Sequence, residues 1–536
     1  MKIISIINRK LLSLQRWQSL LVLSSFIFLV INLTMITKVN SNLHFGNYFF
    51  LAQEIICAFL IHYFFYLLFF VRYIGPLLVY LIFLQEVAVF YFFINFGKNI
   101  DPWVIADIID NFDFVKEFFS VTYLFAILVA TIFFIIFSYL ISKSKQNNFK
   151  NKNFLIFHFV AILTLVFVGI FADKVLKKIR KNYPPLNIVA SAIKLNSMSR
   201  SDELKDFVKK ANESKKIVDA NHISYYRNNE KLIVIFIISE SVRSDIFFEL
   251  IPKYSDFIYN NKNIAFYKDV KACATLTRKA VPCLITNVDH SNWQNFINSV
   301  NIIDVFNKAL FDTHWIDNQP LYGVFDSTYS LLAKNSNNVI EQKSLENNFN
   351  SKKLDEFIIP HIKRAIDSND KNKFIISHLL GSHWHLEERY SEDYRFFHDI
   401  CESGKDSSLC SRDQVINSYK NSVIYGFSVV EKIIKMVEKE NAIVIYTSDH
   451  GFSLGENGIY GNAAENNPIE QLNTPLFIWF SDNYKKNNPQ NVKNILSKKN
   501  KKITHENVFN TIIGCSNIKT SIKNNALDIC KNDKNR

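Results

Sequence analysis

Five long apolar runs dominate the amino-terminal third of the sequence and most constrain how this chain can fold. They cover residues 19–36, 48–71, 76–96, 118–141 and 154–172. A helix that crosses a hydrocarbon core needs about 20 largely apolar residues, so each run is a candidate transmembrane helix. The first run follows a basic segment, but no small-residue cleavage site comes after it, so we expect it to be retained and not removed as a signal peptide.

Charged residues are concentrated after these runs, which indicates a soluble domain behind a membrane domain. We predict a transmembrane domain with five helices over 1–173. A juxtamembrane surface helix and linker are expected over 174–229, where Pro184 and Pro185 interrupt a basic stretch. The soluble domain should occupy 230–536.

Two independent signals place that soluble domain outside the cytoplasm. The loop after the fourth run carries four lysines, whereas the loop after the third run carries four aspartates, so the positive-inside rule puts the amino terminus in the cytoplasm. Six of the seven cysteines lie as close pairs in the soluble half, which is typical of an oxidising compartment. The pairs are Cys273 and Cys283, Cys401 and Cys410, and Cys515 and Cys530. Six cysteines allow fifteen pairings, so proximity alone leaves the connectivity open.

The formal net charge of +13 does not indicate a nucleic-acid-binding protein. The basic residues are scattered or flank the apolar runs, and no basic-aromatic recognition motif is present. A basic domain beside a bilayer is better suited to anionic lipid head groups. We therefore expect membrane lipids as partners and no nucleic acid.

Four short apolar runs in the soluble half predict buried strands, at 232–239, 373–380, 442–447 and 476–480. Amphipathic helices are expected between them at 354–366 and 414–440. Strands that alternate with helices predict an α/β domain with a parallel sheet covered on both faces.

Carboxylates and imidazoles fall at or near the carboxyl ends of these strands. They are Glu240, His378, His383, Asp449 and His450. Sites in open α/β sheets are built at that edge. A capping or core role could explain any one of these residues but hardly all five, and mixed carboxylate and imidazole ligands suit zinc.

The segment from Cys273 to Cys283 is rich in hydroxyl groups and could hold one of them as a nucleophile on a tight, cross-linked turn. The alternative is that the two cysteines only staple a surface loop whose threonines are turn residues. Both interpretations stay open on these residues alone.

Four motifs together resemble the membrane-anchored phosphoethanolamine transferases that modify lipopolysaccharide, members of the alkaline phosphatase and sulfatase superfamily. The segment 240–245, ESVRSD, is similar to the family's E-T-A-R-A-D. The segment 273–283 is similar to C-G-T-A-T-(five residues)-C. The other two are HLLGSH at 378–383 and SDHGFSLGENGIY at 448–460. The resemblance extends over the whole chain, including the five spans.

This resemblance implies a five-helix membrane bundle followed by a sulfatase-like α/β domain in the periplasm, anchored in the inner membrane. Glu240, Thr277, Asp449 and His450 would bind one zinc ion, with the presence of a second left open. Thr277 would be the nucleophile that takes phosphoethanolamine from phosphatidylethanolamine and passes it to lipid A or a core sugar. His378 and His383 would lie near the phosphoryl group or a second metal. The resemblance also implies a Cys401–Cys410 disulfide, and we expect a monomer.

The sequence departs from the family pattern at two places. Asn462 stands where the family usually has a histidine, and Tyr322 stands where it has a phosphate-contacting lysine flanked by cysteines. His385 is a candidate replacement for the lost head-group contact. The pair Cys515 and Cys530 lies outside the pattern and could form a staple or stay reduced.

Two other functions compete with this hypothesis. A phosphoglycerol-type transferase that acts on another envelope lipid or glycan would use a similar threonine. A membrane-anchored binding or scaffold protein with weakened catalysis would explain Asn462 and Tyr322. A sulfatase would need a C-x-P-x-R type sequence at the nucleophile, and none surrounds Thr277.

Overall fold

A computed structural model describes residues 84, 127–128, 131–132, 135, 218, 223–225, 230–288, 299–319, 329–342, 354–402, 410–462 and 467–531. The five expected membrane spans lie outside this set, apart from six helical residues, and so do most of the 174–229 segment and Tyr322. In the described residues, no helix has both the length and the apolar character that crossing a bilayer requires. Contacts divide the chain into two compact units, Met1–Ile105 with Phe118–Asn196, and Ala106–Glu117 with Ser197–Arg536. The second unit contains every strand that the structure describes.

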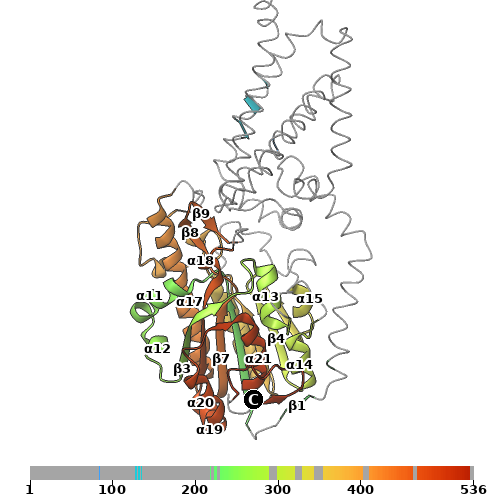
Figure 1. Ribbon diagram of the computed structural model, residues 1–536. Helices are drawn as coiled ribbons and strands as arrows, with labels where there is room; N and C mark the ends of the chain where they lie inside the picture. Colours follow the sequence, from blue (N-terminus) through green and yellow to red (C-terminus); the bar gives the residue numbers. More distant parts are fainter. Residues whose placement is uncertain are drawn as a thin grey trace, which may run out of the picture. The chain divides into compact units, whose positions relative to one another are not determined.

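A central sheet organises the described part of this unit (Figure 1). Its eight strands lie in the order β11 (Ile503–Thr504), β3 (Ile264–Lys271), β10 (Asn473–Phe480), β7 (Asn441–Ser448), β2 (Leu232–Ser239), β6 (Lys373–His378), β4 (Asp312–Asp317) and β5 (Asn338–Glu341). Strands β7, β2, β6, β4 and β5 are parallel to one another. Strand β10 is antiparallel to both of its neighbours, β7 and β3. The α/β prediction is therefore confirmed, but the sheet is mixed and not wholly parallel.

The predicted strands at the centre of the sheet are confirmed, whereas the direction of the fourth was wrong. Strands β2, β6 and β7 lie where the apolar runs predicted them. The chain between β7 and β10 contains only the short hairpin of β8 (Ser453–Glu456) and β9 (Ile459–Gly461) and the four-residue helix α18 (Ile469–Leu472). A strand parallel to β7 would need a long crossover connection, usually a helix, to bring the chain back to the edge of the sheet where β7 begins. The described part of the connection contains no such helix, and β10 runs antiparallel to β7.

The two faces of the sheet are covered by different helices, which explains why the central strands are apolar throughout. In β2, Val234 and Phe236 point into one core, while Ile233 and Ile235 point into the other. The helices α11 (Ser244–Tyr254), α12 (Asp256–Tyr259), α16 (Ile358–Asp367) and α17 (Arg412–Val437) contribute to the second core. The helices α13 (Thr277–Ile285), α14 (Ile302–Lys308), α20 (Pro489–Ser497) and α21 (His505–Cys515) contribute to the first. Figure 1 shows α11 and α17 on one side of the sheet and α13 and α14 on the other.

The remaining elements are short. They are β1 (Ser224–Tyr225) paired with β12 (Ile518–Lys519), α15 (Ser330–Ala333), α19 (Asp482–Asn487), η3 (Asp355–Phe357), η4 (Leu386–Glu388) and η5 (Glu392–Tyr394). The two predicted helices are confirmed as η3 with α16, and as α17. Helix α17 begins earlier than predicted because Ser411 caps it: the Ser411 hydroxyl accepts a hydrogen bond from the Gln414 backbone, and the Gln414 side chain accepts one from Ser411 N.

All three sequence-adjacent cysteine pairs form disulfides. Cys273 is bonded to Cys283, Cys401 to Cys410, and Cys515 to Cys530. Of the fifteen possible pairings, the structure has the one in which each of these cysteines bonds to its nearest partner in the sequence.

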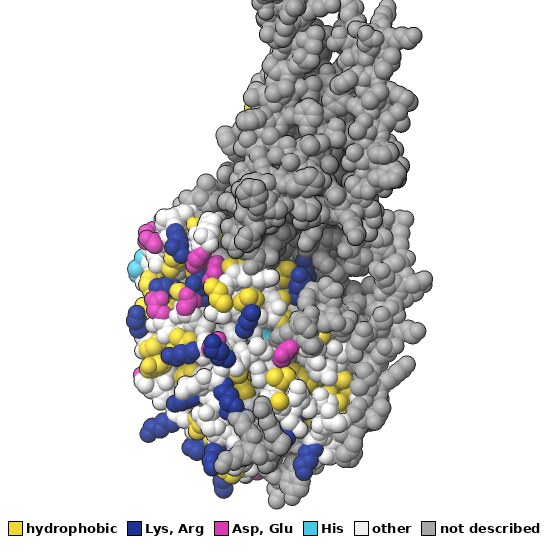
Figure 2. Space-filling view, in the orientation of Figure 1, with side chains coloured by type: hydrophobic (Ala, Val, Ile, Leu, Met, Phe, Trp, Pro, Cys, Tyr) yellow, Lys and Arg dark blue, Asp and Glu magenta, His cyan; other side chains and the backbone are white. Residues whose placement is uncertain are grey.

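The surface of the described domain carries scattered charge. Figure 2 shows Lys and Arg side chains spread over the visible face and mixed with hydrophobic and acidic ones.

Candidate active site

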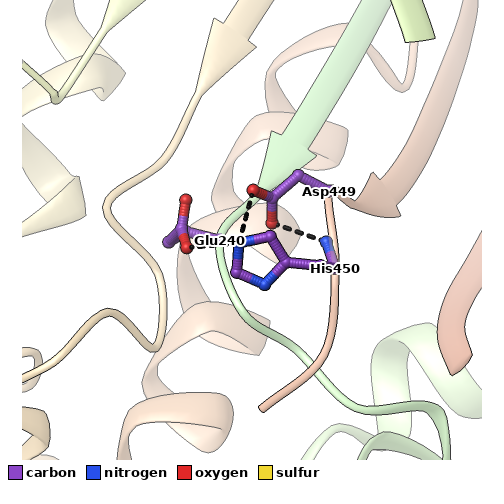
Figure 3. Close-up of side chains that lie close together, drawn as sticks. All are labelled: Glu240, Asp449 and His450. Carbon is purple, nitrogen blue, oxygen red and sulfur yellow. Dashed lines mark hydrogen bonds and ion pairs between the residues drawn. The ribbon is translucent and has the colours of Figure 1, made fainter. Parts of the chain in front are cut away.

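Strand ends bring Glu240 and Asp449 together. Strands β2 and β7 are parallel neighbours, and Ser239 lies opposite Ser448 in their register. Glu240 and Asp449 are the next residues on each strand, and the Asp449 backbone N–H donates a hydrogen bond to Ser239 O over 3.0 Å. His450 follows at once. The three side chains are fully buried and converge on one point (Figure 3).

Thr277 reaches the same point from a different element. Strand β3 runs in the same direction as β7, because β10 is antiparallel to both, so its carboxyl end lies at the same edge of the sheet. Helix α13 follows and begins at Thr277. The disulfide from Cys273 to Cys283 joins the segment after β3 to the body of this helix.

The Thr277 hydroxyl contacts two of the converging side chains. It donates a hydrogen bond to Glu240 Oε2 over 2.9 Å, and it lies 3.2 Å from His450 Nε2. The structure thus brings together the four residues Glu240, Thr277, Asp449 and His450. Because Thr277 is the first residue of α13, the positive end of the helix dipole favours negative charge beside it.

The tautomer of His450 follows from its hydrogen bonds. Its Nδ1 lies 2.8 Å from the carbonyl oxygen of Gly451, which can only accept, so Nδ1 carries the proton. In the neutral ring, Nε2 then presents a lone pair. This lone pair faces Glu240 Oε1 at 3.3 Å and Asp449 Oδ2 at 3.1 Å, so three electron-rich atoms point at one another.

The spacing of these atoms suits a zinc ion. Tetrahedral ligands at about 2.0–2.1 Å from zinc lie roughly 3.3 Å from one another, close to the separations of 2.9 to 3.3 Å observed here. Asp449 Oδ2 is buried and accepts no hydrogen bond from the described residues. A buried carboxylate oxygen without a donor costs free energy, which a bound cation would recover.

The two carboxyl groups differ in their acidity. Burial by itself would raise the pKa of Glu240, but the neighbouring His450, His383 and His378 lower it to about 2. Burial and the negative charge of Glu240 raise the pKa of Asp449 well above its usual range. Two buried carboxylates this close repel each other, and a divalent cation between them would hold both in the charged form.

His378 is the last residue of β6. It is fully buried, and its Nδ1 is 3.2 Å from Asp317 Oδ1 at the end of β4. Its Nε2 is 3.2 Å from the side-chain nitrogen of Gln319. Both ring nitrogens of His378 therefore contact protein groups. Burial would lower the pKa of His378, but Asp317 and Glu240 raise it.

Gln319 is a residue of the site that the sequence interpretation missed. Its side-chain nitrogen donates to Glu240 Oε2 over 3.2 Å and to Leu379 O over 3.0 Å. It follows β4, whose sequence, Asp312–Asp317, is too polar to be predicted as a strand although every residue in it is buried. The signal that could have found it is the polar triplet Asp317-Asn318-Gln319 directly after Trp315 and Ile316.

Two further residues singled out by the sequence, His383 and Asn462, lie near this point. His383 is near enough to Glu240 to lower its pKa. Asn462 Nδ2 is 3.1 Å from His450 Nε2. Tyr322 lies outside the described residues.

The turn after Glu240 is held in a rare conformation by neighbouring segments. Ser241 has φ 62°, in the left-handed region that a non-glycine residue seldom adopts. Its N–H donates to Asp449 Oδ1 over 3.1 Å, and its carbonyl accepts from the Tyr419 hydroxyl over 2.7 Å. Tyr419 OH also accepts from the Arg243 N–H over 2.8 Å. Tyr419 in α17 therefore holds the turn that directly follows Glu240.

Glu456, in the SDHGFSLGENGIY motif, helps to hold the turn after Glu240. The Arg243 guanidinium pairs with Asp245 over 2.7 Å and with Glu456 over 2.8 Å. The pair with Glu456 joins the turn after β2 to the β8–β9 hairpin, so the ESVRSD and SDHGFSLGENGIY segments are in direct contact.

Comparison with known proteins places this geometry in a family. A family model described as "Sulfatase" matches residues 233–518, more than half of the chain and all of the central sheet except Leu232. The chain belongs to the sulfatase family. The matched range includes Glu240, Thr277, Asp449 and His450. In this member of the family, a threonine is the first residue of helix α13.

Relatives of this sulfatase-family chain include two transferases of Escherichia coli strain K12. Phosphoethanolamine transferase EptA is 26% identical over 325 residues, covering 58% of each chain. Kdo(2)-lipid A phosphoethanolamine 7''-transferase is 28% identical over 350 residues, covering 63% of this chain and 60% of the relative. The chain thus aligns with about three fifths of the length of these curated relatives.

Among solved structures, the integral membrane protein lipooligosaccharide phosphoethanolamine transferase A (EptA) from Neisseria meningitidis has a similar fold. The TM-score is 0.69, with 20% identity over 95% of this chain and 97% of that one. At this identity the likeness concerns the fold.

Proposed function

We propose that this protein is a metal-dependent phosphoethanolamine transferase of the cell envelope, with phosphatidylethanolamine as donor and lipid A or a core sugar of lipopolysaccharide as acceptor. The observation that carries the proposal is the Thr277 hydroxyl, which lies within hydrogen-bond distance of both Glu240 and His450 at a buried point lined by electron-rich atoms. The names of the relatives supply the substrate class.

The residues would act in two half-reactions. In the first, the Thr277 oxygen forms a bond to the phosphorus of the donor, and the bond from phosphorus to the glycerol oxygen breaks. The Thr277 proton leaves toward Glu240 Oε2, to which it is already directed, and the departing diacylglycerol takes up a proton from solvent. In the second, an acceptor oxygen attacks phosphorus, loses its proton, and releases Thr277, which is protonated again.

Glu240, Asp449 and His450 would hold a zinc ion, with Thr277 as the fourth ligand. When bound, zinc would favour the alkoxide of the nucleophile and withdraw charge from the phosphoryl oxygens. The protein's own contribution is orientation: the start of α13 directs the Thr277 oxygen, the Cys273–Cys283 disulfide restrains it, and the helix dipole favours the anionic phosphoryl group.

The setting we propose is the inner membrane, with five helices within 1–173 as anchor, a juxtamembrane segment over 174–229 and the catalytic domain over 230–536 in the periplasm. The apolar runs, the loop charges and the three disulfides support this arrangement. An anchor would keep a site that uses two lipids close to both of them.

Mass spectrometry of envelope lipids tests the proposal. Lipid A and core oligosaccharide are compared from cells that express the full chain, the Thr277→Ala variant or neither, with equal protein levels checked by immunoblot. We expect a mass increase of one phosphoethanolamine group on one of the two fractions, seen only with the unaltered chain. An added glycerophosphate would instead assign a phosphoglycerol transferase. Identical glycolipids in all three strains would contradict the proposal.

A further inference from the structure

A second cluster of candidate metal ligands lies outside the site around Thr277. It consists of His385, Glu387 and Glu388, whose nearest ligand atoms all lie within 4.8 Å of one another. Glu387 and Glu388 belong to η4, and His385 directly precedes it. The element packs against α17 through Leu386, which is buried in the second core, so the cluster is fixed to a rigid part of the domain.

Glu387 is the residue that points to a ligand. Its side chain is only 9% exposed and faces His385, with Oε1 at 3.7 Å from His385 Nδ1. That distance is too long for a hydrogen bond, and Glu387 Oε1 accepts none from the part of the chain that the structure describes. A buried carboxylate oxygen without a donor loses its hydration without replacement, unless a cation approaches it.

The charged groups around the cluster favour the binding of a cation. The Arg389 guanidinium donates to the Trp384 carbonyl over 3.0 and 3.1 Å, and is 4.0 Å from Glu388 Oε2. It therefore offsets part of the charge of Glu388. Glu387 adds a second carboxylate to the cluster, so two carboxylates face one guanidinium and the cluster attracts a positive ion.

We propose that His385, Glu387 and Glu388 form a second divalent-cation site, separate from that of Glu240, Asp449 and His450. One imidazole nitrogen and two carboxylates are ligands that zinc accepts. Three protein ligands leave a coordination position open, as in sites where a metal contacts a substrate oxygen. Trp384, next to His385, packs on Phe452, two residues after His450, so the site lies on a segment in contact with the loop of the first centre.

Zinc binding by the full-length chain in detergent tests this site. All proteins in this test carry Asp449→Asn, which removes one ligand of the site formed by Glu240, Asp449 and His450 and so reduces zinc binding there. The Asp449→Asn protein is stripped with a chelator, dialysed against buffered zinc and assayed for bound zinc by mass spectrometry of the metal. Glu387→Gln is then added to that background, and Glu392→Gln serves as a matched control, because Glu392 is an exposed glutamate on η5.

We expect the Asp449→Asn protein to hold one tight zinc ion that Glu387→Gln removes or weakens at least about tenfold, whereas Glu392→Gln leaves it in place. Zinc should also raise the Tm of the Asp449→Asn protein and not that of the double variant. If Glu387→Gln does not fold, as judged by near-ultraviolet circular dichroism, His385→Gln is used in its place. Equal zinc content and equal Tm shifts with and without Glu387 or His385 would overturn the site.

Discussion

The side-chain amide of Gln319 donates a hydrogen bond to Glu240 Oε2 over 3.2 Å, on the same oxygen that accepts from the Thr277 hydroxyl. One amide thus links the end of β4 to the carboxylate oxygen that accepts a hydrogen bond from Thr277. It also lies 3.2 Å from His378 Nε2, so a single side chain orders both Glu240 and His378.

Replacing Gln319 should therefore weaken catalysis more than folding. A hydrogen bond to a charged group contributes about 1.5–3 kcal/mol, so Gln319→Leu should lower kcat/KM roughly 10- to 100-fold in a transfer assay with phosphatidylethanolamine. Gln490→Leu is the control, since Gln490 bonds to Asn494 in α20 and to no residue of the site. Equal losses in both variants would show that Gln319 has no special link to Glu240.

Gly381 should not tolerate a side chain. It has φ 51°, and a Cβ there would lie 2.7 Å from Glu240 O and 2.8 Å from Glu240 N. Gly381→Ala should destabilise the domain by more than about 1 kcal/mol and displace Glu240, which would lower both Tm and activity. Gly426→Ala is the matched control: apart from its chain neighbours and the backbone of its own helix, no atom lies within 4 Å of its added Cβ, and in the interior of α17 it should stabilise by roughly 0.5–1 kcal/mol. Unchanged activity in Gly381→Ala would contradict the close approach.

The Cys273–Cys283 disulfide should matter for activity in addition to stability, because it restrains the helix that begins at Thr277. Replacing both cysteines with alanine should cost about 3 kcal/mol, as should removal of Cys515–Cys530, since both close short loops. Assays well below both melting temperatures should show a larger loss of kcat for the Cys273 and Cys283 variant. Comparable kcat values would mean that this disulfide serves stability alone.

Asp312 and Lys373 should make the domain sensitive to acid. Lys373 is fully buried and bonds Asp312 over 2.8 Å. Burial would raise the pKa of Asp312, but Lys373, Asn369 and His314 lower it well below its usual value. The folded pKa is thus below the unfolded one, near 3.9. The stabilisation is complete above that value and is lost as the pH falls through the folded pKa.

Asp312→Asn should accordingly lower the free energy of unfolding by about 3–5 kcal/mol at neutral pH, since it leaves a buried ammonium without its carboxylate. The difference in the free energy of unfolding between Asp312→Asn and the unaltered protein should become smaller as the pH falls below about 4. Asp367→Asn removes an exposed partner of Lys363 and should change stability by less than about 1 kcal/mol. Denaturant titrations across the pH range measure both, and a gap that widens in acid would refute the assigned direction.

Much of the fold was predictable because its signals are local. The runs at β2, β6 and β7 are buried on both faces, so each is apolar throughout and recognisable without knowledge of its neighbours. Glu240, Asp449 and His450 follow those runs directly, which made their convergence predictable from strand direction alone. Strand β4 was missed because its buried polar residues have partners that are distant in sequence, such as Lys373 for Asp312.

The sequence by itself determined which segments are buried strands, that carboxylates and imidazoles follow them, and which cysteines lie close enough to pair. Only the tertiary structure decided that β10 runs against its neighbours, that Gln319 joins Glu240 to His378, and that Glu387 turns a buried oxygen toward His385. The reason is physical: the burial of a strand is marked by its own residues, whereas the direction of a strand in the sheet and the donor that meets a given oxygen are set by the closure of segments that lie far apart in the chain.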